Sequence, residues 1–466
     1  MYNVPGVYIS DKQNGVNFNF ENSSSVGAMI GVTRSGILNI PQKVSSWTEF
    51  INKFANGLDT PFSENLYLPY SVYGFFANGG KELYIVSIKG KGAKKATNTS
   101  GPYVFTAKNE GEWGNELSYS ISKTSEDIFS VTVSLGNESV TLKNVTFETF
   151  VKSLESNRKI KEWVDVELKE ATKLIEIETQ QLSGGSDGET LTDSEYVDAL
   201  SYLDTLTGVT LVSIPAQTST TITNKLLEYC GENNLFPLLD VPLGTSVADV
   251  ITFRKSIDAW TGEVAYPWGK VNDPLTGTLK TVPSSGHLMG LYARTIESRG
   301  VFKAPAGVEA VVKGFVDLEY HLTSNEISEL NPVGVVCICA RPNIGIVVWG
   351  ARSLNSSDNT MRYVSDGLLN LHIKRNLYNN TQFAVFEPNN EKLWQSLRTV
   401  CLNFLEDLRI QGAFKGNSPE ECYYVTVDST NNTSDTIDEG QVNIEIGYAP
   451  VKPAEFVIIK LAHSLI

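Results

Sequence analysis

The residues that could carry chemistry gather in two short stretches, SGGSDG at 183–188 and VVCICARP at 335–342. A Gly-rich loop can bind an oxyanion or a phosphate through successive backbone N–H groups, here around Ser186 and Asp187. Gly beside Ser or Asp is also the ordinary composition of a turn, so we favour a turn at a domain boundary. No GxxxxGK[ST] motif is present, and GKGAKKAT at 90–97 has the wrong spacing for a phosphate-binding loop.

Cys337 and Cys339 are two positions apart, so on a strand their side chains face the same side. A metal site would need two further converging ligands. The four histidines share no ligand spacing: His287, His321, His372 and His463. We therefore expect reduced core cysteines, no metal and no cofactor. A multidomain hydrolase that uses the SGGSDG loop or a core cysteine is the alternative, although no nucleophile, base and orienting group form a visible set.

The overall charge restricts the classes of partner. The 466 residues include 53 acidic and 38 basic side chains, which gives a formal net charge of −15. Such a surface field opposes binding to nucleic acid or to an anionic membrane. The N-terminal MYNVPGVYIS lacks a basic stretch followed by an apolar run, and no stretch approaches the roughly 18 apolar residues that span a bilayer. We expect no nucleic-acid partner, no secretory leader and no direct membrane insertion.

The apolar patterns predict an α/β (mixed α+β) multidomain protein. Segments typical of strands and helices alternate on both sides of a region rich in strands, which favours an α/β layer interrupted by an inserted domain. The linkers are the Gly, Lys and Ser/Thr-rich segment 90–101 and the SGGSDG loop. The predicted parts are an N-terminal arm (1–22), an α/β domain in two pieces (23–101 and 183–345), an inserted mostly-β domain (102–182), a terminal domain (346–451) and a C-terminal arm strand (452–466).

The terminal domain contains the clearest single elements. NEKLWQSLRTVCLNFLEDLRIQG predicts an amphipathic helix that is capped by Asn389 or Asn390 and stops at Gly412. CYYVTVD and QVNIEIGY alternate as half-buried antiparallel strands do. The second strand places four apolar side chains on one face: Val442, Ile444, Ile446 and Tyr448.

One further apolar strand, AEFVIIKLA, follows the spacer APVKP. Its side chains are apolar on both faces, as in an inner strand of a sheet. One face carries Val457, Ile459 and Leu461, and the other carries Phe456 and Ile458. An unpaired apolar strand recruits other chains. This strand therefore either docks inside its own chain or pairs with another one.

Several separated stretches carry a family likeness: PGVYIS, NGGKELYIVSI, NEGEWGNELSYSI, SGGSDG, YPWGKVNDPLTG through ARTIESRGVFKAPAG, GIVVWGARSL, FEPNNEKLW, FLEDLRIQGAFKG and GQVNIEIGYAPVKPAEFVIIKLA. Together, and in this order along nearly the whole chain, they resemble the contractile tail sheath family of bacteriophages and phage-tail-like injection systems. The resemblance implies peripheral domains threaded through a terminal core domain, with both chain ends reaching neighbouring subunits. It implies a non-enzymatic subunit of a virion tail or phage-tail-like particle, assembled in the host cytoplasm.

The resemblance also implies hexameric rings stacked helically around a tail tube protein, with baseplate and tail terminator proteins as further partners. Strand addition would then bury the two arms in adjoining subunits, while APVKP acts as a flexible connector. The predicted arm residues are Val4, Val7, Tyr8, Ile9, Phe456, Val457, Ile458, Ile459 and Leu461, and the predicted acceptor strand is 442–448. Lys392, Arg398 and Arg409 on the long helix are candidate tube contacts.

Overall fold

The computed structural model describes residues 6–11, 14–17, 25–57, 61–64, 66–169, 173–257, 259–456 and 458. Its largest element is an eight-stranded sheet, which is parallel except at its two edges, β20 and β4. In sheet order the strands are β20 (Gly345–Val348), β19 (Val335–Arg341), β15 (Glu263–Tyr266), β14 (Phe236–Asp240), β13 (Leu211–Ser213), β3 (Gly27–Gly31), β5 (Leu83–Ser87) and β4 (Gln42–Val44). The predicted α/β layer is therefore present.

Helices cover both faces of this sheet because its strands are apolar on both sides. In β3, Ala28 and Ile30 join one hydrophobic cluster and Met29 joins the other. The Met29 side is covered by α1 (Trp47–Phe54), α2 (Leu68–Ala77) and α8 (Ser285–Arg299). The opposite side is covered by α5 (Asp193–Asp198), the 3-10 helix η2 (Ala199–Thr205), α6 (Thr220–Asn233), α7 (Val247–Lys255) and α9 (Ser324–Leu330).

A small antiparallel sheet extends the Met29 side of the layer. It contains β16 (Gly269–Asn272) between β17 (Leu279–Val282) and β18 (Asp317–Leu318). Phe315, next to this sheet, lies over the ring of the buried His287 of α8, with 4.3 Å between the ring centroids. Among the described residues, no helix is long and apolar enough to cross a membrane.

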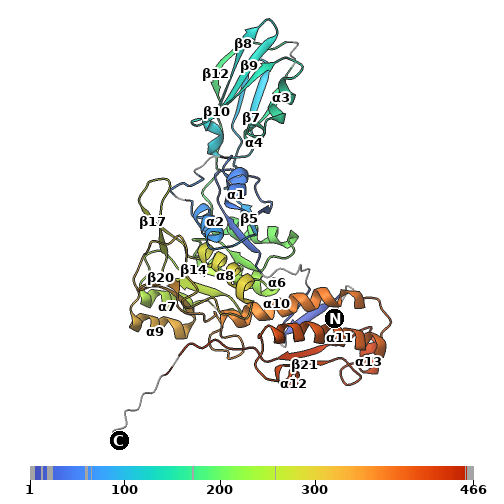
Figure 1. Cartoon of the computed structure of the whole chain (residues 1–466). Helices are drawn as coiled ribbons and strands as arrows, with labels where there is room; N and C mark the ends of the chain where they lie inside the picture. Colours follow the sequence, from blue (N-terminus) through green and yellow to red (C-terminus); the bar gives the residue numbers. More distant parts are fainter. Residues whose placement is uncertain are drawn as a thin grey trace.

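The inserted domain lies between β5 and β13 and projects from one end of the α/β domain (Figure 1). Two antiparallel sheets enclose a separate hydrophobic cluster that runs from Ala96 to Leu182. One sheet has the order β10-β9-β8-β12 and the other β11-β7-β6. Their bounds are β6 (Thr97–Ser100), β7 (Tyr103–Ala107), β8 (Leu117–Ser125), β9 (Ile128–Leu135), β10 (Glu138–Val145), β11 (Val164–Leu168) and β12 (Ile177–Gln181), with η1 (Glu112–Glu116), α3 (Phe150–Ser156) and α4 (Ile160–Trp163) between them.

Two long helices, α10 (Val364–Thr381) and α11 (Glu391–Ile410), dominate the terminal domain (Figure 1). Asn390 caps α11 by accepting from the N–H groups of Lys392 and Leu393, and Gly412 follows its end with φ of 88°. The smaller elements of this domain are η4 (Gln382–Ala384), α12 (Pro419–Cys422), β21 (Tyr423–Thr426), α13 (Ser434–Asp438) and β22 (Glu445–Tyr448).

The structure differs from the predicted segmentation at two boundaries. β6 lies before residue 102, where the insert was predicted to start. Its residues pair with β7, so β6 belongs to the inserted domain. β20 falls in the predicted terminal domain, yet it pairs with β19 at the edge of the large sheet. In both places a strand belongs to the sheet that supplies its hydrogen bonds, and composition alone does not show which sheet that is.

Candidate functional site: the β21–β22 sheet and the root of the C-terminal arm

β21 and β22 form a two-stranded antiparallel sheet on which α11 lies. Val425 is opposite Ile446, and Tyr423 is opposite Tyr448. Cys401 of α11 belongs to the same hydrophobic cluster as these strands. Among the described residues, no further strand pairs with either outer edge of this sheet. The sheet therefore has backbone N–H and C=O groups to offer to an added strand.

The predicted second strand begins at 445 rather than at 441, because asparagine side chains take up the preceding backbone. Asn432 accepts from the backbone N–H of Asn443 at 2.6 Å and donates to its carbonyl at 3.0 Å. Asn431 donates to the carbonyls of Asn443 at 3.0 Å and of Thr426 at 2.8 Å. Of the four predicted acceptor residues, Ile446 and Tyr448 thus lie in β22. Val442 and Ile444 precede it and pack against the core.

The chain beyond β22 is docked on its own body, in contrast to the flexible connector that the sequence suggests. Val451 donates to the carbonyl of Ala413 at 3.1 Å, and the carbonyl of Ala449 accepts from the N–H of Lys415 at 2.7 Å. The Nζ of Lys452 then pairs with Asp366 in the first turn of α10 at 2.7 Å. We call residues 449–455 the arm root.

Glu455 makes the second ionic contact of the arm root. Arg352 donates to it in a fork, from Nη2 to Oε2 at 2.7 Å and from Nε to Oε1 at 3.0 Å. Asn331 and the hydroxyl of Tyr363 also donate to this carboxylate, each at 3.2 Å. We call the pairs Lys452–Asp366 and Arg352–Glu455 the root latch.

Burial and the ionic partners act in opposite directions on the two carboxylates of the latch. Burial acts to raise the pKa of Glu455, but the hydrogen bonds from Arg352 and Asn331 outweigh it, so the pKa lies below its usual range. Burial raises the pKa of Asp366, and the ammonium of Lys452 opposes that shift. Sequence reasoning missed this latch, because nothing in the APVKP segment indicates which distant side chains its neighbours contact.

Some of the predicted arm residues are among the described residues, and others are not. Phe456 and Ile458 directly follow the latch, and they are 75% and 79% exposed. Val4, Val457, Ile459 and Leu461 lie outside the described residues. No described residue beyond Glu455 forms a strand, so pairing of this segment with a neighbour stays a prediction.

The N-terminal segment, expected to be an extended arm, forms a hairpin. β1 (Tyr8–Asp11) pairs with β2 (Asn14–Asn17) of the same chain, with Ile9 opposite Val16. Ile9 also packs against the main hydrophobic cluster, and Val7 directly precedes β1. The predicted pairing of Val7, Tyr8 and Ile9 with a neighbouring subunit is not tested by this hairpin.

The three cations expected to face a tube differ in their surroundings. Arg409 forms a fork with Glu406, at 2.6 and 2.8 Å, and the hydroxyl of Tyr423 also donates to Glu406 at 2.7 Å. These contacts lower the pKa of Glu406 to about 2. Arg398 donates to the carbonyl of Val425 at 3.4 Å, and Lys392 lies in the first turn of α11. The charge of Arg409 is therefore largely compensated within the chain.

The SGGSDG loop acts as a junction between the inserted and α/β domains. Its residues pair with the other linker in antiparallel bridges, Lys94 with Ser186 and Thr97 with Ser183. The hydroxyl of Ser186 accepts from the N–H of Gly188 at 3.0 Å. Asp187 forms an ion pair with the buried ammonium of Lys89. Ser186 and Asp187, the side chains of this loop that the hydrolase alternative would use, thus take part in a turn and in an ion pair.

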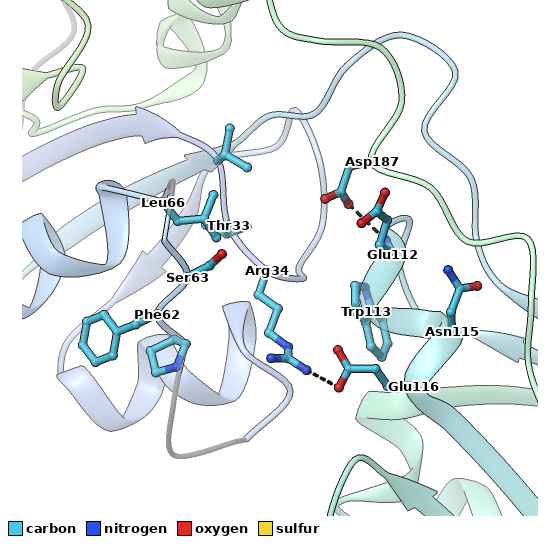
Figure 2. A pocket seen from close by; sticks show the side chains of 12 residues that line it. Thr33, Arg34, Phe62, Ser63, Leu66, Glu112, Trp113, Asn115, Glu116 and Asp187 are labelled. Carbon is cyan, nitrogen blue, oxygen red and sulfur yellow. Dashed lines mark hydrogen bonds and ion pairs between the residues drawn. The ribbon is translucent and has the colours of Figure 1, made fainter. Parts of the chain in front are cut away.

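A pocket of about 380 Å³ lies beside this loop (Figure 2). Arg34 and Glu116 face each other across it in an ion pair of 2.7 Å, and Asp187 accepts from the N–H of Glu112 at 3.1 Å. The described residues that line this pocket include no cysteine or histidine. The arrangement joins two domains and offers no nucleophile with a neighbouring base.

The five cysteines are all buried. Burial raises the pKa of Cys337 to about 12 and that of Cys401 to about 11, so these groups remain thiols at neutral pH. Within the described part of the chain, no group of three or more His, Cys, Asp or Glu residues is placed to hold a metal ion.

Two domain families match adjoining parts of the chain. The phage tail sheath protein central domain matches residues 190–354, and the phage tail sheath C-terminal domain matches residues 357–462. The tail sheath protein of Salmonella phage ViI is 23% identical over 233 residues, or 48% of this chain and 36% of the relative. That of Enterobacteria phage T4 is 20% identical over 237 residues, or 48% of this chain and 34% of the relative. These matches span about a third of the curated relatives.

Solved structures from contractile injection systems and of a sheath tail protein share the fold. A chain of the anti-feeding prophage baseplate gives a TM-score of 0.64 at 21% identity, with 100% of both chains covered. The contracted sheath complex of the extracellular contractile injection system PVC gives 0.62 at 22% identity, with 100% and 98% covered. The sheath tail protein of Desulfitobacterium hafniense gives 0.65 at 17% identity, with 91% and 94% covered. With both sheath domain families matched in sequence, the chain belongs to the contractile tail sheath family of bacteriophages and phage-tail-like injection systems.

Proposed function

We propose that this sheath subunit assembles in stacked hexameric rings around a tail tube and contracts to drive the tube through a target envelope. Its C-terminal arm adds a strand to the terminal domain of a neighbouring subunit. The observation that carries the proposal is the pair of exposed apolar side chains, Phe456 and Ile458, that begin a segment of apolar residues directly after a fixed root.

The receiving surface is the β21–β22 sheet. No described strand pairs with its outer edges, which would therefore supply backbone partners for the added strand. Ile446 and Tyr448 lie in the strand that we assign as acceptor. Four ladder hydrogen bonds contribute roughly 0.5–1.5 kcal/mol each. Burying Phe456 and Ile458 adds roughly 1.5–3 kcal/mol each. A gross gain of several kcal/mol, before the cost of ordering the segment, is suited to a link that persists during contraction.

Contraction in this proposal uses energy stored during assembly and needs no nucleotide. Subunits assemble in an extended lattice and move to a better-packed one while the arms keep them connected. The N-terminal segment around Val7, Tyr8 and Ile9 forms a second link after release from its hairpin. Tail tube, baseplate and tail terminator proteins are the proposed further partners. Since Arg409 is paired with Glu406, Lys392 is the favoured tube contact on α11.

A non-enzymatic role is supported by the relatives, which are sheath proteins. The hydrolase alternative gains no support from the candidate residues, because Ser186 and Asp187 serve the domain junction and Cys339 is buried in β19. A hydrolase screen in which Ser186→Ala or Cys339→Ala abolished turnover would favour the alternative.

Deletion of residues 454–466 tests the proposed function. We expect a folded protein, with unchanged circular dichroism, that forms no sheath tubes in electron micrographs under conditions in which the full chain does. Replacement of the exposed Ile175, which lies in the inserted domain, by Ser is the control, and it should leave assembly unchanged. Normal tubes from the deleted protein would overturn the role of the arm.

A further inference from the structure

The root latch joins the arm root to two separate parts of the body. Lys452 contacts Asp366, near the start of α10. Glu455 contacts Arg352, in the loop after β20, and Asn331 in η3 (Asn331–Val333). The arm root therefore bridges the α/β domain and the terminal domain.

The two pairs have opposite polarity, and this fixes the register of the chain. A cation at 452 meets an anion, and an anion at 455 meets a cation. A slip of three residues that brought 455 to the position of 452 would place Glu455 beside Asp366, and two like charges repel. The fork from Arg352 adds orientation, because a guanidinium binds a carboxylate in one plane.

Half-buried and exposed residues alternate from Val451 to Phe456, and Glu455 is the last of them that a side-chain hydrogen bond or ion pair holds. The side chains of Arg352 and Glu455 are 15% and 16% exposed, whereas the next residue, Phe456, is 75% exposed. Among the described residues, no hydrogen bond or ion pair involves Phe456 or Ile458, so Glu455 is the last anchored side chain of the arm. A pivot for the arm belongs at this point and not in the preceding APVKP segment.

We propose that Arg352 and Asp366 are positioning residues that fix the point and the direction in which the C-terminal arm leaves the subunit. This inference rests on the proposed function, in which the segment after Glu455 pairs with a neighbour. Leu461 is six positions beyond Glu455, so the added strand has to pair within roughly 20 Å of the latch. A force on the arm during contraction is then transmitted to α10 and to the loop that carries Arg352. It does not act on β22.

Distances between two spin labels report how well the direction of the arm is fixed relative to the body of the subunit. One label replaces Phe456, and the other replaces the exposed Glu232 on α6. The native cysteines are buried, so labels attach to the introduced positions. We expect a narrow distance distribution in the otherwise native chain. Glu455→Gln, Arg352→Ala and Asp366→Asn should each broaden it at least twofold.

A charge exchange separates positioning from general stability. In the double variant Arg352→Glu/Glu455→Arg the ion pair is restored, and both Tyr363 and Asn331 can accept hydrogen bonds as well as donate them. The exchange should recover the narrow distribution, while either single reversal should not. Arg299→Ala removes a comparable but exposed ion pair with Glu309 and should change nothing. A distribution that is broad in the native chain, or equally narrow in Glu455→Gln, would overturn the inference.

Tube assembly completes the test. Arg352→Ala and Glu455→Gln should reduce the yield of tubes at least tenfold, and the charge exchange should restore it. If deletion of 454–466 prevents assembly while the latch variants assemble normally, the positioning role is wrong and the proposed function stands. If the deleted protein assembles, the proposed role of the arm in assembly fails, and the label distances still test whether the latch fixes the direction of the arm.

Discussion

Glu263 provides a quantitative test of the core, because it is a carboxyl group buried in the centre of the large sheet. It begins β15 and is fully buried. Tyr292 of α8 donates to its Oε2, and its Oε1 has no partner among the described residues. Burial raises the pKa of Glu263 to about 8, the hydrogen bond from Tyr292 opposes this shift, and the nearby Asp240 adds to it. The folded protein therefore holds a proton that the unfolded chain releases near pH 4.5.

The sign of the effect follows from proton linkage. Between the ordinary pKa and the raised one the folded state binds one proton more than the unfolded state, so stability falls as pH rises. The slope is about 1.4 kcal/mol per pH unit, or roughly 3 kcal/mol between pH 5.5 and pH 8. Glu263→Gln stays neutral and keeps an acceptor for Tyr292. This substitution should remove the fall in stability that Glu263 causes between pH 5.5 and pH 8.

Urea unfolding at several pH values, followed by tryptophan fluorescence, measures the effect. The difference in unfolding free energy between Glu263→Gln and the native protein should change by roughly 3 kcal/mol in favour of the variant from pH 5.5 to pH 8. Glu155→Gln changes an exposed position of α3, and its unfolding free energy should vary with pH in the same way as that of the native protein. Parallel curves for Glu263→Gln as well would refute a raised pKa at this site.

Two further substitutions test close contacts. Gly290→Ala places a Cβ 2.2 Å from the carbonyl oxygen of Phe75, so α8 and α2 must separate. We expect a loss of about 3 kcal/mol in urea unfolding, whereas Gly231→Ala, with open space on α6, should be neutral or stabilising by up to about 1 kcal/mol. Lys89→Met leaves Asp187 without its buried partner and loosens the insert, so limited proteolysis should cleave the two linkers at least several times faster than in the native protein. Unchanged cleavage would show that the ion pair does not hold the insert.

Elements with a strong local signal could be predicted from the sequence. The helix α11 is an example, because its apolar stripe, the Asn390 cap and Gly412 all act within one segment. The alternation of strands and helices likewise predicted the large sheet. β22 was predicted too long, since the asparagines that replace its first pairing partners lie in a loop more than ten residues away along the chain.

Of the candidate site, only the apolar side chains could be named from the sequence, and their role stays a prediction. The exposed residues Phe456 and Ile458 follow from the pattern of the last strand. The partners of Lys452 and Glu455 do not, because an ion pair between positions about 90 to 100 residues apart leaves no periodicity in either segment. The same holds for the N-terminal hairpin, whose pairing depends on the surface against which it lies.

The two linkers of the inserted domain pair with each other where the chain enters and leaves it. Where Lys94 faces Ser186 and Thr97 faces Ser183, the entering and leaving strands are neighbours, roughly 5 Å apart as in any antiparallel pair. A different module with closely spaced ends could replace the whole insert while β5 and β13 keep their places. The inserted domain and the α/β domain that carries it can therefore diversify independently.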